Sequence, residues 1–183
     1  MMQIILMTTL TLPNLLSVAR LFMAPVAFYF ILCMAWAPAA IVLWLAISSD
    51  IADGYLARKW NQTSALGGLL DHASDAILVS TMLAAEAYLG IVPWVLPLLV
   101  ILAFTQYTLD SDALVGQPLR ASKLGRYNGI CYFVLAGFPI MQHTLDIYLL
   151  PLETFKYLAY LLVISTIISM GERLLTLINL KRR

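Results

Sequence analysis

Six long stretches of the sequence consist mainly of apolar residues, and they constrain the fold more than any other feature. A helix that crosses a bilayer needs about 20 predominantly apolar residues, and 62% of the 183 residues are hydrophobic while only 11% are charged. The composition therefore predicts an all-α, polytopic integral membrane protein with a single transmembrane domain over residues 1–183. We expect six transmembrane helices, over residues 15–37, 39–58, 66–89, 91–109, 125–144 and 154–180.

The positions of the basic residues predict how these helices are oriented. Lys and Arg are enriched in the loops on the cytoplasmic side of a membrane. We expect an N-in/C-in arrangement, with both termini in the cytoplasm, because Lys156 is then the only basic residue in the outer connections. The net charge of +1 gives no reason to expect a nucleic acid partner, and the first eleven residues are expected to form a short interfacial segment. The basic residues assigned to the cytoplasmic side are Arg58, Lys59, Arg120, Lys123, Arg126, Lys181, Arg182 and Arg183.

Four aspartates interrupt the apolar stretches, with Asp50 and Asp53 in the second expected helix and Asp71 and Asp75 in the third. An unpaired charge inside a spanning helix costs at least about 2.5–3.5 kcal/mol on insertion scales, so such residues indicate a functional site. At about 100° per residue, each pair falls on one narrow face of its helix. We expect the two faces to meet, so that the four carboxylates converge.

Small residues lie on or next to these acidic faces. Gly54 and Ala57 share the face on the second helix, Gly67 shares the face on the third, and Gly68 follows it. They are interpreted as room for a ligand beside the carboxylates. Close helix packing is the alternative, and it stays open most of all for Gly68.

A cluster of carboxylates repels itself unless a cation sits within it. Oxygen ligands without His or Cys favour Mg2+, Mn2+ or Ca2+ over zinc, and Mg2+ usually joins a few carboxylates to the phosphates of a substrate. The sequence therefore predicts a divalent metal site with a phosphorylated ligand. Arg58 marks the expected cytoplasmic end of the second helix, and Asp50 lies only about 12 Å from it along the helix axis. The site is therefore expected close to the cytoplasm.

Ion pairs that only hold the helices together are a structural alternative to a metal site. The candidate partners of the aspartates are Arg20, Arg58 and Lys59. Three bases do not neutralise four acids, and ion pairing gives no reason for the glycines on the same faces. We therefore favour the metal site. His72 is interpreted as a packing or hydrogen-bonding residue, because its side chain is turned about 100° away from that of Asp71.

Eight residues between positions 50 and 75 stand at gaps that resemble the signature of the CDP-alcohol phosphotransferase family. The runs LPNLLSVARLFMAP and DGYLARKWNQ also look like the bacterial phosphatidylglycerophosphate synthase-like members of that family, and the resemblance covers residues 12–90 well. In the family this signature spans the second and third of six transmembrane helices. The residues that carry it are Asp50, Asp53, Gly54, Ala57, Arg58, Gly67, Asp71 and Asp75.

The resemblance implies a metal-dependent enzyme of phospholipid synthesis. It would transfer a phosphatidyl group from CDP-diacylglycerol to a small alcohol and release CMP, with two Mg2+ or Mn2+ ions at the diphosphate. Asp75 would be both a metal ligand and the general base, beside the metal ligands Asp50, Asp53 and Asp71. The resemblance further implies a homodimer in the bacterial inner membrane, with its site facing the cytoplasm. The residues expected to bind the CDP group are Asp50, Asp53, Gly54, Ala57, Arg58, Gly67 and Asp71.

The acceptor alcohol is left open by the sequence. Arg120, Lys123 and Arg126 match the second anion pocket of members that use a phosphorylated alcohol, but they fit a positive-inside loop equally well. Glycerol 3-phosphate is slightly favoured over inositol phosphate, phosphatidylglycerol, serine or choline, and a CDP-amino-alcohol is an alternative donor. Two other classes remain as rivals, namely a membrane prenyltransferase of the UbiA type and a cation transporter lined by carboxylates.

Overall fold

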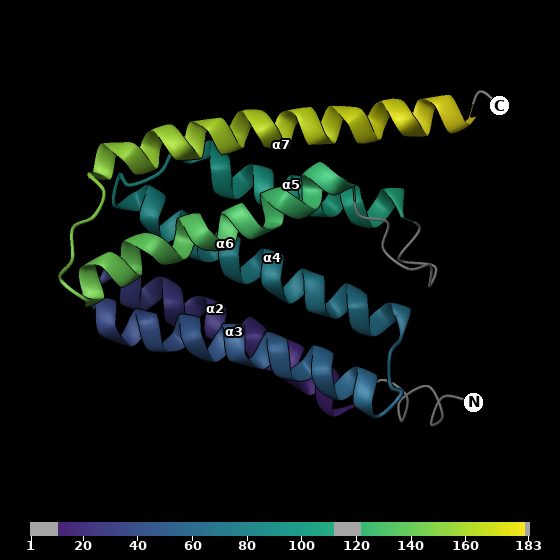
Figure 1. Ribbon diagram of the computed structural model, residues 1–183, viewed down its shortest axis with the longest axis horizontal. Helices are drawn as coiled ribbons and strands as arrows, with labels where there is room; N and C mark the ends of the chain where they lie inside the picture. Colours follow the sequence, from purple (N-terminus) through teal and green to yellow (C-terminus); the bar gives the residue numbers. More distant parts are fainter. Residues whose placement is uncertain (1–10, 112–121, 182–183) are drawn as a thin grey trace.

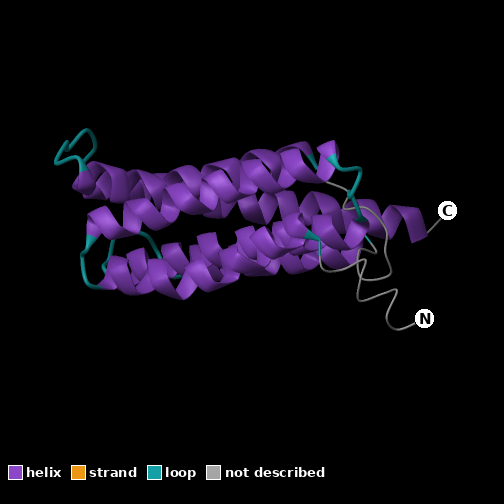
Figure 2. Cartoon of the chain, turned by 90° about the horizontal axis from the view of Figure 1, so that it is seen from below, coloured by secondary structure: helices purple, strands orange, loops and turns teal. Residues whose placement is uncertain are grey.

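A computed structural model describes residues 11–111 and 122–181, which form six helices and no strand. The helices lie side by side along the long axis of the molecule (Figures 1 and 2). This confirms the predicted all-α fold. The expected interfacial segment lies almost entirely outside the described residues, as does Arg120. The helices are α2 (Leu12–Leu32), α3 (Trp36–Lys59), α4 (Ala65–Tyr88), α5 (Val95–Asp110), α6 (Lys123–Thr144) and α7 (Leu152–Lys181).

Helix α4 lies at the centre of the bundle. It packs against α2, α5 and α6, while α3 packs against α2 and α6, and α7 packs against α5 and α6. Successive helices run in opposite directions, so the start of α2 and the end of α7 lie at the same end of the bundle (Figure 1). We refer to this end, which also holds the α3–α4 connection, as the polar end. Its assignment to the cytoplasm stays a prediction from the charge pattern.

Hydroxyl side chains cap the N-termini of three helices at the polar end. The Oγ1 atom of Thr11 accepts a hydrogen bond from a backbone N–H in the first turn of α2, at 3.4 Å. Ser64 caps α4 in the same way at 2.9 Å, and Ser122 caps α6 at 3.0 Å. Such caps satisfy N–H groups that have no partner within the helix. They fix where α2, α4 and α6 enter the bundle.

Three predicted helix boundaries were wrong. Helix α2 ends at Leu32 rather than at residue 37, and α3 already begins at Trp36. Pro38 therefore lies in the first turn of α3, where its missing N–H costs no helical hydrogen bond, and not in the connecting turn. Helix α5 begins at Val95 rather than at residue 91, after a turn in which Gly90 has a φ of 77°.

Three of the helices are long and apolar enough to cross a membrane by length and composition. They are α2, α3 and the part of α7 from Leu152 to Ile178. Helix α5 is apolar but shorter, and α4 and α6 carry more polar residues along the faces described below. The chain is therefore treated as a membrane protein, and the crossing of all six helices stays a prediction.

The interior of the bundle is mainly apolar away from the polar end and more polar towards it. Glu86, near the far end of α4, is a fully buried acid within the mainly apolar part. Ile31, Leu83 and Phe155 belong to the apolar core, which lies away from the polar end. Towards the polar end, buried side chains such as Arg20 and Asp53 are charged. Because the apolar side chains are tightly packed away from the polar end, the functional site is expected in the more polar part of the interior.

Candidate functional site

A buried polar face of α2 points at the aspartates. Asn14, Ser17 and Arg20 recur every three residues along this otherwise apolar helix, and all three are buried. The hydroxyl group of Ser17 donates a hydrogen bond to Asp53 Oδ2 at 3.2 Å. From the sequence, Arg20 is only one of three candidate bases, and Asn14 and Ser17 have no predicted role. Their regular spacing in an apolar helix was the signal that could have identified them.

Arg20 joins all four aspartates. One of its guanidinium nitrogens contacts Asp50 at 3.0 Å and also Asp75, and the other contacts Asp71 at 2.9 Å and also Asp53. The Arg20 side chain is completely buried. The predicted convergence of the carboxylates of α3 and α4 is therefore present, and a cation from α2 lies at its centre.

The charges in this cluster do not balance. With all four carboxylates ionised, −4 meets the +1 of Arg20, which leaves −3. Arg20 contacts one oxygen of each carboxylate, so each carboxylate has a second oxygen for another cation. One oxygen from each of Asp50, Asp53 and Asp71 lies within 4.8 Å of the others. An excess of hard oxygen ligands at this spacing fits a divalent ion.

The ion-pair alternative holds for Arg20 alone among the three bases considered. Within the described part of the chain, Arg58 and Lys59 form no ion pair with the aspartates. Arg58 instead folds back over Gly54, where an added Cβ would lie 3.4 Å from a guanidinium nitrogen. This places a cation beside the acidic face of α3 without neutralising it.

The two neighbouring glycines of α4 differ in their surroundings. An added Cβ at Gly67 would lie 3.0 Å from the side chain of Asn14, so this glycine permits the close approach of α2. An added Cβ at Gly68 would meet no atom within 4 Å, and Gly68 lines a cavity. Gly67 therefore lets α2 approach α4 closely, and open space lies beside Gly68.

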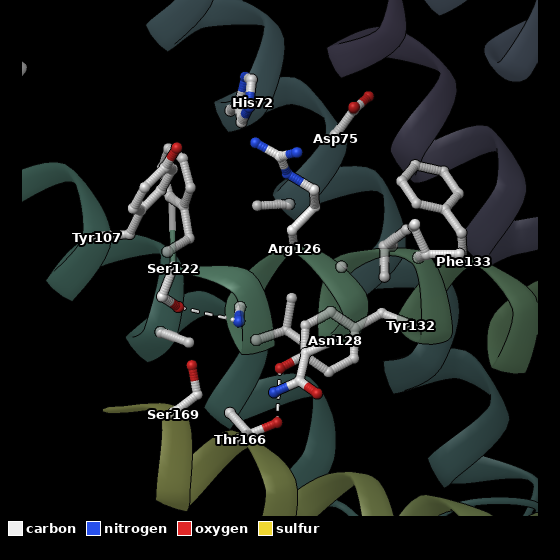
Figure 3. Close-up of a pocket in the computed structure, with 18 of the residues that line it drawn as sticks. His72, Asp75, Tyr107, Ser122, Arg126, Asn128, Tyr132, Phe133, Thr166 and Ser169 are labelled. Atoms are coloured by element: carbon white, nitrogen blue, oxygen red, sulfur yellow. Dashed lines mark hydrogen bonds between the residues drawn. The ribbon is translucent and has the colours of Figure 1, made fainter. Parts of the chain in front are cut away.

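This cavity has a volume of about 900 Å3 and is bounded by α4, α5, α6 and α7. Asp75 belongs to its wall and also contacts Arg20, so it lies between the aspartate cluster and the cavity. Figure 3 shows the guanidinium group of Arg126 directed towards the end of the cavity where Asp75 and His72 lie. A carboxylate and a cation thus border the same space.

The three predicted acceptor-binding residues are not equivalent. Arg126 lines the cavity, whereas Lys123 is exposed and lies outside the lining. Arg120 lies outside the described residues. Of the two that the structure describes, only Arg126 lines the same cavity as Asp75.

Sequence reasoning missed an ion pair between α5 and α7. Arg173 Nε donates to Asp110 Oδ2 at 3.0 Å, and the guanidinium group of Arg173 lies 4.8 Å from the centre of the Tyr107 ring. Arg173 and Tyr107 both line the cavity. An acid near the end of one apolar helix and a base near the end of another carry no sequence signal for pairing. Their contact depends on how α5 and α7 pack.

His72 has the surroundings of a hydrogen-bonding residue. Its Nδ1 atom lies 2.9 Å from the carbonyl oxygen of Gly68 and 3.8 Å from Asp71 Oδ2. Its ring centre lies 6.2 Å from that of Tyr107 across the cavity wall. The Nδ1 contact within α4 agrees with the interpretation of His72 as a residue other than a metal ligand.

The chain belongs to the CDP-alcohol phosphatidyltransferase family, which it matches over residues 10–171. A cardiolipin synthase (CMP-forming) of Rattus norvegicus is 43% identical over 84 residues, which are 45% of this chain and 28% of the relative. A cardiolipin synthase (CMP-forming) of Streptomyces coelicolor is 41% identical over 92 residues, which are 46% of this chain and 42% of the relative.

A relative whose name includes glycerol 3-phosphate matches a longer segment. It is a CDP-diacylglycerol–glycerol-3-phosphate 3-phosphatidyltransferase of Cereibacter sphaeroides, 41% identical over 126 residues, which are 64% of this chain and 57% of the relative. Across these three relatives, the chain therefore spans between 28% and 57% of their length. The family is established, and the predicted resemblance is confirmed.

Proposed function

We propose that this protein transfers a phosphatidyl group from CDP-diacylglycerol to the hydroxyl group of an acceptor alcohol and releases CMP. The observation that carries the proposal is the position of Asp75. It lies between a cluster of carboxylates suited to a metal-bound diphosphate and a cavity that the cationic side chain of Arg126 lines. Membership of the CDP-alcohol phosphatidyltransferase family supports this function.

The donor would bind on the side of the cluster formed by α3 and the start of α4. We assign the CDP group to the acidic faces of these helices, where Arg58 lies over Gly54 and supplies positive charge near the phosphates. Gly54 and Ala57 have no side chain or a small one, so that a nucleotide can approach the carboxylates of α3. The residues assigned to the CDP group are Asp50, Asp53, Gly54, Ala57, Arg58, Gly67 and Asp71.

Divalent metal ions would be held by the carboxylates that converge on this side. We assign Asp50, Asp53, Asp71 and Asp75 as ligands of two Mg2+ or Mn2+ ions. When bound, such ions offset the negative charge on the attacked phosphate and on the departing nucleotide. The donor set fits, because hard oxygen atoms predominate and no thiol or imidazole is among the assigned ligands.

Asp75 would act as the general base for the acceptor. Its carboxylate belongs to the cavity wall, so it can accept the proton of a hydroxyl group bound there while the oxygen attacks the phosphorus atom. Arg126 would bind a phosphate group of the acceptor and hold the hydroxyl towards Asp75. We place this site at the cytoplasmic face of the bacterial inner membrane and, by analogy with the family, in a homodimer.

The first test of the proposed function is metal dependence. Purified protein supplied with CDP-diacylglycerol and candidate acceptors is expected to form CMP and a phospholipid with Mg2+ or Mn2+. Excess EDTA is expected to reduce the rate to background, and added metal to restore it, because the carboxylate cluster alone repels the diphosphate. Full activity in excess EDTA would rule out the proposed site.

The second test concerns Arg126. Replacing Arg126 by Gln is expected to raise the KM for the acceptor about tenfold, because a hydrogen bond to a charged group contributes about 1.5–3 kcal/mol. The KM for CDP-diacylglycerol should stay nearly constant. The matched variant Lys123→Gln removes the same charge from outside the cavity and should have a smaller effect. Equal effects would mean that the loop charge as a whole, and not a cavity contact, attracts the acceptor.

A further inference from the structure

The cavity beside Asp75 is graded from polar to apolar along its length. Arg126, Arg173 and Tyr107 line it towards the polar end of the bundle. Val79 and Val100 line its inner part and are almost completely buried. An occupant that fits both parts has a charged head and an apolar body.

The cavity is much larger than a small alcohol requires. Its volume of about 900 Å3 is near the upper end of the range of about 300–1,000 Å3 typical of sites for drug-sized ligands. Along α4 alone, the lining runs from Ala65 to Val79, a rise of about 21 Å. Glycerol 3-phosphate would occupy only the polar part and leave the apolar part to water or lipid, at a cost in buried apolar surface.

The charge of the cavity suits a singly charged phosphodiester. Arg173 is already paired with Asp110 at 3.0 Å. Arg126 has no ion pair within the described part of the chain, and Lys123 lies outside the lining. One such arginine matches the single charge of a phosphodiester better than the double charge of a phosphomonoester.

The chemistry of the reaction places the acceptor, and not the donor, in this cavity. In a displacement at phosphorus, the attacking hydroxyl and the leaving group lie on opposite sides of the phosphorus atom. If CMP leaves on the side of Asp50 and Asp53, the hydroxyl approaches from the side of Asp75, where the cavity lies. For the acyl chains of the donor we assign a separate groove of about 300 Å3 between α2 and α4, which Leu21 and Ile77 help to line.

We infer that the acceptor is itself a membrane lipid, a glycerophospholipid with a free hydroxyl group in its head group, such as phosphatidylglycerol. Its phosphodiester binds at Arg126, its hydroxyl group faces Asp75, and an acyl chain lies in the inner part of the cavity. The hydroxyl oxygen forms a bond to the phosphorus atom, the bond to CMP breaks, and the hydroxyl proton passes to Asp75. This inference rests on the proposed function and shifts the preference away from glycerol 3-phosphate.

A chain-length series on the wild-type protein tests the inference without any mutation. Radiolabelled CDP-diacylglycerol is offered with phosphatidylglycerol, its dihexanoyl form, its fully deacylated form or glycerol 3-phosphate. The kcat/KM is expected to fall by about tenfold or more when the acyl chains are removed, since each 1.4 kcal/mol is tenfold. Equal or faster transfer to glycerol 3-phosphate would overturn the inference while leaving the proposed function intact.

A pair of glycine variants locates the acyl chain. Gly129 lines the cavity, and an added Cβ there would meet no atom within 4 Å, so Gly129→Leu fills empty space. Gly171 on α7 has the same open surroundings but lies outside the lining, which makes Gly171→Leu the matched control. Gly129→Leu is expected to lower transfer to phosphatidylglycerol about tenfold or more, whereas Gly171→Leu stays near wild type.

Three measurements separate the possible failures. If Gly129→Leu raises the KM for CDP-diacylglycerol and not for phosphatidylglycerol, the cavity holds the donor's chains and the inference is wrong. If the wild type forms no CMP with any acceptor, the proposed function fails. In that case native mass spectrometry of phosphatidylglycerol bound to the wild type and to both variants still decides the inference. Retention by all three proteins alike, or by none, would contradict it.

Discussion

Replacing Asp75 by Asn is expected to lower the rate of phosphatidyl transfer by about 100- to 10,000-fold, the usual contribution of a positioned general base. Asn has nearly the same shape but cannot accept the proton of the acceptor hydroxyl. Because Asp50, Asp53 and Asp71 remain, binding of CDP-diacylglycerol should persist. The measurements are the single-turnover rate of CMP release and the shift in Tm that CDP-diacylglycerol produces.

The matched control for this variant is Asp146→Asn. Asp146 lies in the connection between α6 and α7, at the opposite end of the bundle, with a φ of 52° that Asn also tolerates. The Asp146→Asn variant makes the same chemical change far from the cavity and should leave turnover near wild type. Normal turnover by Asp75→Asn would show that another group accepts the proton.

Much of the fold followed from the apolar pattern, because spanning helices need long apolar segments and little else. The boundaries were less predictable. The pattern runs unbroken from α2 into α3, and the sharp turn there depends on Met34, which has a φ of 54°. A positive φ is uncommon at a residue other than Gly and carries no clear sequence signal, so the predicted bounds put the turn at Pro38 instead.

The candidate site, like the fold, could be predicted only in part. The convergence of the acidic faces of α3 and α4 could be predicted, because helical spacing alone puts each pair of aspartates on one face. The spacing of Asn14, Ser17 and Arg20 indicates a buried polar face on α2, but its partners could not be predicted, since one arginine within an apolar helix fits several of them. The cavity could not be predicted either. It arises where α4, α5, α6 and α7 stand apart, and its walls combine residues as distant in sequence as Gly68 and Arg173.

Arg20 also explains how four acids coexist inside a membrane protein before any substrate arrives. Its guanidinium group reaches one oxygen of every carboxylate, so it draws together α3 and α4, the two helices that must present these oxygens to a metal. The remaining negative charge keeps the site receptive to divalent cations. Arg20 is therefore a positioning residue, since it acts through the aspartates.

Replacing Arg20 by Gln is expected to destabilise the protein by about 3 kcal/mol in EDTA, the lower end of the cost of breaking a buried ion pair, because Asp50 is still 44% exposed. This lowers Tm by several degrees, and Mn2+ should restore more of the lost Tm in the variant than it adds to the wild type, since a divalent cation replaces the missing charge. The matched control is Lys59→Gln, which removes the same charge from an exposed residue of α3. Equal Tm values for the two variants in EDTA would show that Arg20 does not hold the aspartates together.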